Sequence, residues 1–349
     1  MRALLAELGD PQLAYPSIHV VGTNGKSTTT RMTAALLREA GLRVGAYTSP
    51  HVAGWGERLD TDAAAFERAV RRVQAPATGL GATQFEVLTA AALAEFAEQG
   101  VDAAVVEAGL GGRLDATNVL RAPVVVLTNV GLEHMEQLGE TREEIAAEKL
   151  AVVQAAATVV LSEAEWEPLA RSSGAEAVVL AGHSNLALAI AAAESFLGRP
   201  VDPHAAESVA LAGRFERRGE SPLELWDGAH TVEALGWLLP RLPDRQYVVV
   251  ASILRDKNVD GMLAALSAVG ETFVATASSN SRALSAEELA TLGRRWFVRT
   301  ETERDPGDAV VRARSIAGPS GAVLVTGSLY LLADLAGRPE DVPSGAKGA

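Results

Sequence analysis

The run GTNGKST at residues 22–28 contains the residue types that bind phosphate. Glycines let backbone N–H groups approach an anion closely, a lysine adds a mobile cation, and a following hydroxyl can reach Mg²⁺. The strict phosphate-loop motif also needs a glycine at position 20, where the chain has Val20. The run is therefore either a shortened phosphate loop or a glycine-rich turn with an exposed lysine.

Three further polar residues follow predicted strands, namely Ser49, Glu107 and His134. Ligands of open parallel sheets bind beyond the carboxyl ends of the strands. A serine hydroxyl there could coordinate Mg²⁺, and Glu107 is a natural ligand for a hard metal beside a phosphate loop. Taken alone, Ser49 in TSPH is mainly a turn signal, and His134 is equally well explained by a structural role.

Later segments carry further candidates. Arg113, Asp115 and Asn118 follow Glu107 on a predicted loop, where binding groups tend to lie. Asp227 and His230, in LWDGAH, could contact a ribose and a phosphate or base, although the pattern alone does not decide this. Lys149 alone reads as a solvated lysine on an amphipathic helix.

These residues need a framework of alternating strands and helices. Segment 18–21 is a predicted strand, 83–100 a long helix, and 141–153 a helix opened by a capping box. We predict an α/β fold, with a P-loop-type, mostly parallel sheet domain followed by a smaller Rossmann-like domain. The predicted limits are 1–212 for the ATP-binding domain, 213–335 for the C-terminal domain and 336–349 for a flexible tail. The other predicted strands are 44–48, 102–109, 122–130, 158–162, 177–182, 223–230, 246–252, 272–277, 295–300 and 322–328, and 183–199 is a further helix.

Composition excludes several classes of protein. With 31 basic and 44 acidic residues the formal charge is −13, which argues against a broad surface for nucleic acid or anionic membrane. The chain has no cysteine, so any metal must be held by oxygen or histidine. No signal peptide or apolar run of about 18 residues is present, so a cytoplasmic protein is expected.

In order along the chain, the motifs resemble those of the folylpolyglutamate synthase/dihydrofolate synthase family, the folate branch of the Mur ligase superfamily. The resemblance spans roughly residues 2–335, and EAGLGGRLDATN is its most specific part. The superfamily has a shortened loop ending in Gly-Lys, which accounts for Val20. The matching strings are GTNGKST, YTSPH, ERL, VVEAGLGGRLDATN, GLEHMEQLG, EKLAV, GRF, DGAH and VTGSLY.

The resemblance implies an ATP-binding central domain and a smaller C-terminal domain, with the active site between them. It implies that Lys149 matches a lysine often carbamylated by CO₂, which would help to hold a second Mg²⁺. The implied catalytic residues are Lys149, Lys26 and His230. The implied nucleotide-binding residues are Thr23, Asn24, Gly25, Lys26, Ser27, Thr28, Arg214, Asp227 and His230. The implied Mg²⁺ ligands are Ser49, Glu107 and His134, and Arg113 and Asp115 are assigned to the acceptor.

The implied reaction joins L-glutamate to dihydropteroate, to reduced folates, or to both, through an acyl phosphate made from ATP. A monomer is expected. One alternative is a Mur-type ligase for another carboxylate acceptor, and another is an ATP-binding regulatory module without ligase activity. A ligase predicts phosphate release that depends on both acceptor and glutamate.

The chain departs from the family pattern in several places. Ser27 stands where the family usually has glycine, so either Ser27 or Thr28 could face Mg²⁺. Thr231 and Val232 replace an Asn-Pro pair after His230. The segment before the loop and the stretch from Lys149 to residue 183 are shortened. These departures leave the choice between dihydropteroate and folate open.

Overall fold

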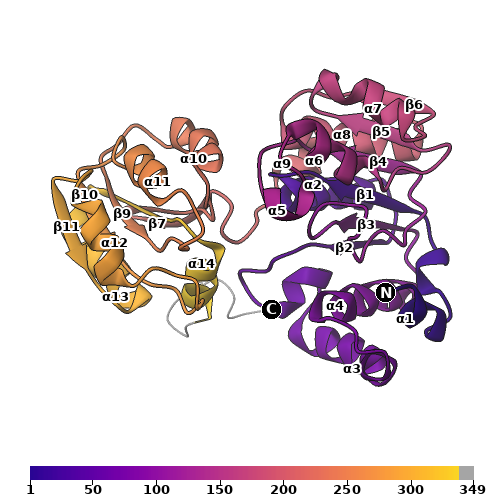
Figure 1. Cartoon of the computed structure of the whole chain (residues 1–349), viewed down its shortest axis with the longest axis horizontal. Coiled ribbons are helices and arrows are strands. Elements are labelled where there is room, and N and C mark those ends of the chain that lie inside the picture. Colours follow the sequence, from indigo (N-terminus) through magenta and orange to yellow (C-terminus); the bar gives the residue numbers. More distant parts are fainter. Residues whose placement is uncertain (338–349) are drawn as a thin grey trace. The chain divides into compact units, whose positions relative to one another are not determined.

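The computed structural model describes residues 1–337, which form two compact units (Figure 1). The first unit comprises Met1–His51 and Trp55–Val209, and the second comprises Val52–Gly54 and the chain from Ala210 onward. The domain limits given above stay a prediction. Of the predicted tail, residues 338–349 lie outside the described residues, and the last described helix ends at Ala336.

The first unit is built on a six-stranded sheet in the order β2-β3-β1-β4-β5-β6. Every neighbouring pair is parallel, so all six strands end at the same edge. β1 lies between β3 and β4, which places the loops after these three strands side by side. The strands are β1 (Ser17–Val21), β2 (Val44–Tyr47), β3 (Ala103–Glu107), β4 (Val124–Leu127), β5 (Thr158–Leu161) and β6 (Ala177–Leu180).

Helices cover both faces of this sheet. Ile18 and Val20 of β1 pack in one apolar cluster with residues of α2 and α8, while Val21 belongs to a second cluster with residues of α6. Because successive side chains of a strand point to opposite faces, β1 is buried on both sides. The helices of this unit are α1 (Arg2–Glu7), α2 (Lys26–Glu39), α3 (Ala63–Gly79), α4 (Gln84–Gln99), α5 (Met135–Leu138), α6 (Arg142–Leu150), α7 (Glu167–Ser172), α8 (Asn185–Leu197) and α9 (His204–Glu207), with 3₁₀ turns at Pro11–Leu13, Trp55–Leu59 and Ala164–Trp166.

Local signals place the helix ends. Thr141 and Glu144 form the predicted capping box at the start of α6, and a second box opens α4. Gly100 and Gly198 take left-handed conformations at the ends of α4 and α8. Glycine adopts this conformation without a steric penalty, so both helices stop where the sequence predicts.

The second unit contains a six-stranded sheet in the order β11-β10-β9-β12-β8-β7. Its pairs are parallel except for β7, which runs antiparallel to β8. The predicted α/β class is thus confirmed, but β7 was not predicted, because ERRGE lacks the apolar pattern of a strand. The elements are β7 (Glu216–Glu220), β8 (Leu223–Trp226), β9 (Tyr247–Ala251), β10 (Thr272–Ala275), β11 (Arg299–Thr302), β12 (Ala322–Thr326), α10 (Val232–Leu238), α11 (Val259–Leu266), α12 (Ala286–Gly293), α13 (Pro306–Ala317), α14 (Leu329–Ala336) and a 3₁₀ turn at Leu239–Arg241.

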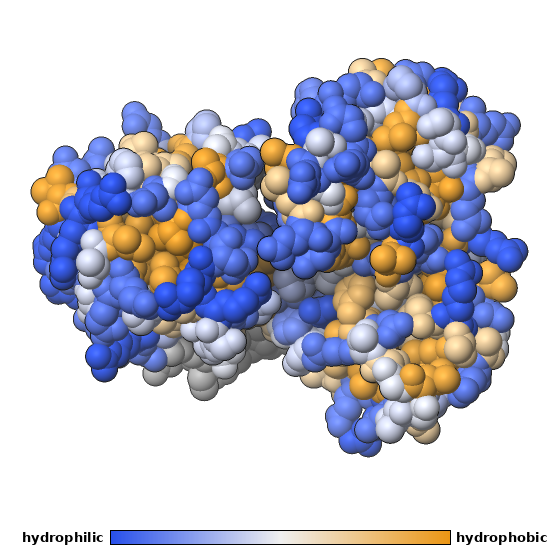
Figure 2. All heavy atoms as spheres, in the orientation of Figure 1, coloured by the Kyte–Doolittle hydropathy of each residue, from blue (hydrophilic) through white to orange (hydrophobic). Residues whose placement is uncertain are grey.

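Hydrophilic and apolar residues alternate over the face of the molecule seen in Figure 2. This mosaic is ordinary for a protein surface, to which apolar atoms always contribute. Among residues 1–337, no helix is long and apolar enough to cross a membrane.

Candidate active site

The loop between β1 and α2 has the backbone geometry of a phosphate loop. Gly22 and Gly25 have φ values of 143° and 82°. A Cβ atom on Gly22 would lie 1.9 Å from Oγ1 of Thr128, and one on Gly25 would lie 2.3 Å from Oδ1 of Asn185. Both positions therefore need glycine for conformation and for space.

The loop is clamped to the segment that follows β4. The backbone N–H of Asn24 donates to Oδ1 of Asn129 at 2.9 Å, and Nδ2 of Asn129 donates to the carbonyl of Asn24 at 3.1 Å. The hydroxyl of Thr23 accepts a hydrogen bond from the N–H of Gly131 at 3.0 Å. These contacts hold the loop in one shape before a ligand binds.

Lys26 is the first residue of α2, a helix of 14 residues. Its half-buried side chain donates to the carbonyl of Thr23 at 3.1 Å, which folds the ammonium back over the loop. The free N–H groups at a helix N-terminus attract anions, and Lys26 adds a full charge at the same place. This end of α2 is suited to phosphate.

Glu107 gathers two of the residues singled out in the sequence. The residue is 2% exposed, and Oε1 of its carboxylate accepts a hydrogen bond from Oγ of Ser27 at 3.1 Å. Oε2 accepts the backbone N–H of Ser49 at 2.9 Å. Ser27, rather than its neighbour Thr28, is thus the hydroxyl that contacts the carboxylate.

This oxygen-rich corner fits a small divalent cation. Mg²⁺ is usually held by one or two carboxylates together with phosphate oxygens and water. Glu107 and the hydroxyl of Ser27 provide such a partial shell next to the phosphate loop. Within residues 1–337, no three His, Asp or Glu side chains are grouped to hold a metal on their own. A bound cation would therefore take some of its ligands from the phosphates of a nucleotide.

Lys149 of α6 is buried, with 1% of its side chain exposed. Its Nζ donates to the carbonyl of Gly22 at 2.8 Å and to Oε1 of Glu133 at 3.0 Å. Burial lowers the pKa of Lys149 to about 8, although the charge of Glu133 acts in the opposite direction. The interpretation of Lys149 as a solvated lysine is wrong, because α6 aims this residue at the phosphate loop.

The segment after β4 brings Glu133 and His134 to the same edge of the sheet. Burial alone would raise the pKa of Glu133, but the charges of Lys26 and Lys149 outweigh it and hold this pKa below its ordinary value. His134 has φ 48° and precedes the first turn of α5. Its role as a metal ligand stays a prediction.

The loop after β3 carries Arg113 and Asp115. Nε of Arg113 donates to Glu148 of α6 at 3.0 Å. The carboxylate of Asp115 accepts the backbone N–H of Leu110 and that of Thr117, each at 2.9 Å. Asp115 therefore shapes a tight turn of this loop.

Asp227 and His230 follow β8 in the second unit. The carboxylate of Asp227 accepts the backbone N–H groups of Phe215 and Ala229 at 2.7 and 2.9 Å. Burial holds the pKa of Asp227 above its ordinary value, although these hydrogen bonds and the charge of Arg214 act in the opposite direction. Nδ1 of His230 lies 2.8 Å from the carbonyl of Gly228.

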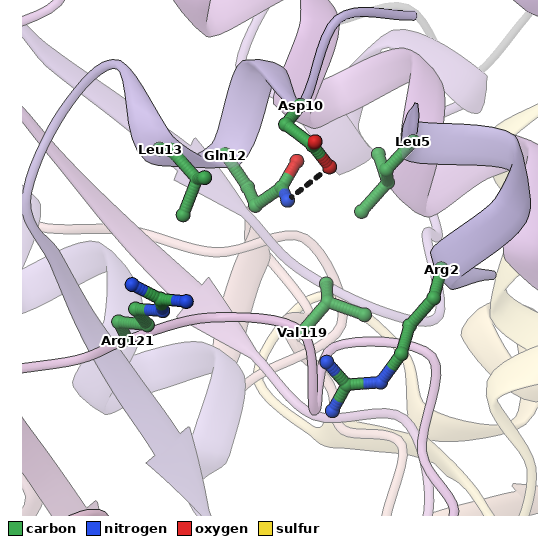
Figure 3. Close-up of a pocket in the computed structure, with 7 residues that line it drawn as sticks. All are labelled: Arg2, Leu5, Asp10, Gln12, Leu13, Val119 and Arg121. Atoms are coloured by element: carbon green, nitrogen blue, oxygen red, sulfur yellow. Dashed lines mark hydrogen bonds between the residues drawn. The ribbon is translucent and has the colours of Figure 1, made fainter. Parts of the chain in front are cut away.

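A separate cavity of about 180 Å³ lies near the starts of β1 and β4, away from the phosphate loop (Figure 3). Nε2 of Gln12 donates to Asp10 across its rim at 3.1 Å. None of the site residues selected from the sequence lines it. The lining residues are Arg2, Leu5, Asp10, Gln12, Leu13, Val119 and Arg121.

Several residues that build the site were missed from the sequence. Asn129 clamps the loop, Glu133 pairs with Lys149, and Thr117 and the buried His19 lie behind Asp115. Asn129 and Glu133 follow a strand end, which could have identified them. His19 lies inside an apolar strand, where a polar residue is itself a signal of a specific contact.

The site combines a phosphate loop on a parallel sheet with a strand-end carboxylate and a buried lysine, which is the arrangement expected of an ATP-dependent ligase of the Mur ligase class. Residues 20–199 match the Mur ligase middle domain, and residues 213–329 match the Mur ligase glutamate ligase domain. The curated dihydrofolate synthase/folylpolyglutamate synthase of Mycobacterium tuberculosis is 33% identical over 92% of this chain and 82% of its own length. The chain belongs to the dihydrofolate synthase/folylpolyglutamate synthase family.

Solved structures of enzymes of this family resemble the chain over nearly its whole length. E. coli FolC in complex with DHPP and ADP has a TM-score of 0.84 and 28% identity, covering 95% of this chain and 90% of its own. The bifunctional enzyme of Yersinia pestis, complexed with AMPPNP and Mn ion, has a TM-score of 0.84 and 29% identity, covering 95% and 90%. Relatives of this chain thus bind adenine nucleotides and a divalent metal.

Proposed function

We propose that this ligase joins L-glutamate to dihydropteroate, to reduced folates, or to both, with ATP converted to ADP and phosphate. The observation that carries the proposal is the convergence of the phosphate loop, the Ser27–Glu107 pair and Lys149 at one edge of the sheet. This edge offers cations and N–H groups to phosphate and carboxylate oxygens to a metal.

The reaction proceeds in two steps. A carboxylate oxygen of the acceptor attacks the γ-phosphorus, and the bond to the β-phosphate oxygen breaks, giving an acyl phosphate and ADP. The amine of L-glutamate then attacks the acyl carbon, loses a proton and displaces inorganic phosphate, which leaves an amide. Both reactants of the first step are anions, so the loop N–H groups and Lys26 reduce their repulsion.

Glu107, Ser27, Ser49 and His134 are proposed to hold the divalent cation with the nucleotide. When bound, Mg²⁺ neutralises phosphate charge and polarises the transferred phosphoryl group. We propose Mg²⁺ as the physiological ion and two ions in the site.

Lys149 is proposed to work as a carbamate. Only a neutral amine adds CO₂, and the pKa of about 8 leaves a fraction of Lys149 neutral at mildly alkaline pH. The ammonium first loses one proton. The neutral amine then forms an N–C bond to CO₂, one C=O bond of CO₂ becomes a C–O⁻, and the nitrogen loses a second proton, so a cation becomes an anion. A carbamate would offer oxygens toward the second cation, beside the phosphate loop and Glu133.

Arg113 and Asp115 are proposed to bind the acceptor. Leu114, between them, is 91% exposed, and Phe85 of α4 packs where a Cβ on Gly109 would fall. Apolar surface next to a carboxylate suits a flat heterocycle that carries N–H donors, such as a pterin.

Arg214, Asp227 and His230 are proposed to contact the nucleotide from the second unit, and a monomer is proposed as the active form.

The experiment that tests the proposed function measures phosphate release with ATP, Mg²⁺, L-glutamate and a panel of acceptors. Release with dihydropteroate or a reduced folate that requires glutamate supports the proposal. Release only with muramyl-type acceptors points to the other Mur-type ligase, and ATP binding without acceptor-stimulated turnover points to a regulatory module.

A further inference from the structure

His19 is a polar residue inside the central strand of the first unit. It is 1% exposed, and its sheet neighbours are Val106 of β3 and Val125 of β4. Strand residues next to it, Ile18 and Val20, belong to the apolar core. An apolar side chain would fill such a position without the cost of burying an imidazole.

The imidazole makes a directed hydrogen bond to the loop after β3. Nε2 of His19 lies 2.8 Å from Oγ1 of Thr117, and this hydroxyl donates to Oδ1 of Asp115. The hydroxyl of Thr117 has a single hydrogen, which it donates in the hydrogen bond to Asp115. The hydroxyl must therefore accept from His19, so Nε2 is the protonated ring nitrogen. Burial lowers the pKa of His19 to about 4, while the charge of Asp115 acts in the opposite direction, so the ring is neutral.

The chain of hydrogen bonds fixes one side of Asp115. Oδ1 is taken by the N–H and the hydroxyl of Thr117, and Oδ2 accepts the N–H of Leu110. The same loop is tied to α6, where the N–H of Arg113 donates to the carbonyl of Glu148 at 3.0 Å. The carboxylate orientation is thus set from β1, and the loop position from α6.

We propose that His19 is a positioning residue for the acceptor, acting through Thr117 to hold the Asp115 carboxylate in its binding orientation. The inference rests on the proposed function, because it takes Asp115 to contact the acceptor. It assigns His19 no contact with substrate. A buried imidazole that costs stability is explained if its benefit appears in acceptor binding.

The test compares His19→Leu, His19→Gln, Thr117→Val and the His19→Leu/Thr117→Val double variant. Leucine fills the space without a donor, whereas the amide nitrogen of glutamine can replace Nε2. We expect His19→Leu to raise the acceptor KM about five- to tenfold. This is the effect expected for loss of one hydrogen bond, here the bond from His19 to Thr117, the partner of the Asp115 carboxylate. KM for ATP and the melting temperature should change little, and His19→Gln should recover most of the loss.

Coupling separates positioning from general damage. Thr117→Val and the double variant should lose similar amounts, because both residues act through one chain of bonds. Additive losses, or an ATP KM that rises with the acceptor KM, would overturn the inference.

Hydrogen exchange of the Leu110 and Thr117 amides provides a readout without turnover. We expect faster exchange in His19→Leu and near wild-type exchange in His19→Gln. Unchanged exchange together with unchanged acceptor affinity overturns the positioning role. Failure of the wild-type protein to use any pteroate acceptor would instead contradict the proposed function, so the two failures are distinguishable.

Discussion

Ser27 donates a hydrogen bond to Glu107 over 3.1 Å, and this pair links the phosphate loop to the end of β3. The residue that departs from the usual family pattern is therefore the one that contacts the strand-end carboxylate. The hydroxyl holds Oε1 of this carboxylate, and the N–H of Ser49 holds Oε2. Ser27, although it differs from the usual family residue, thus contributes a hydroxyl to the proposed metal site.

Replacing Ser27 with alanine should weaken the response to Mg²⁺. Loss of a residue that orients a metal ligand typically reduces metal affinity about 10- to 100-fold. Titration of activity against Mg²⁺ should show a higher half-saturating concentration in Ser27→Ala. Ser17→Ala, at the buried start of β1, is the matched control and should behave as wild type. An unchanged Mg²⁺ response in Ser27→Ala would rule out this role.

Gly25→Ala should damage nucleotide binding, whereas Gly9→Ala should not. The two glycines have φ values of 82° and 80°, so both substitutions carry similar backbone strain of about 1–2 kcal/mol. At Gly9 a Cβ meets nothing within 4 Å, but at Gly25 it meets Asn185. Calorimetry with ADP should therefore show weaker binding only for Gly25→Ala, with partial recovery when Asn185→Ala is added. Equal ADP affinity in both single variants would contradict the clash.

Lys149→Ala should lose activity by about a hundredfold or more, as expected for removal of an electrostatic group at the reacting centre. Added short carboxylates should restore part of it by replacing the carbamate. Lys149→Arg keeps a cation that CO₂ cannot modify, so this control should stay inactive with or without carboxylates. Wild-type rates in Lys149→Ala would remove the residue from the mechanism.

His19 should make the free energy of unfolding fall as the pH is lowered. Its folded pKa of about 4 lies below the ordinary value of 6.5, so the unfolded chain binds the proton more readily. The contribution is full above pH 6.5 and is lost as pH falls toward 4. Between pH 7 and pH 5 it amounts to about 2 kcal/mol. Urea unfolding at both pH values should show a smaller pH effect in His19→Leu than in wild type, and equal pH effects would contradict a buried neutral ring.

Much of the fold could be predicted because the local signals are strong. Capping residues such as Thr141 and Glu144, and stop signals such as Gly100, act within one turn of helix and are visible in any sequence. β7 escaped prediction because this edge strand, ERRGE, consists of charged residues and one glycine and has no apolar residue to form an alternating pattern. Its pairing with β8 depends on the sheet, which the sequence does not display.

The site divides along similar lines. Ser49 and Glu107 could be singled out because the ends of parallel strands meet at one edge of a sheet. The burial of Lys149 could not be predicted from its helix, since it depends on how α6 docks beside Gly22. The pairing of His19 with Thr117 joins residues 98 positions apart, and only the folded chain brings them together.

The most direct test of the central claim is phosphate release measured with purified protein, ATP and Mg²⁺. The proposed function predicts little release with dihydropteroate or glutamate alone, and rapid release with both, accompanied by an amide product of matching mass. Lys26→Ala should abolish this release. Turnover that is independent of glutamate, or absent with every pteroate and folate acceptor, would contradict the assignment as a glutamate ligase of the folate branch.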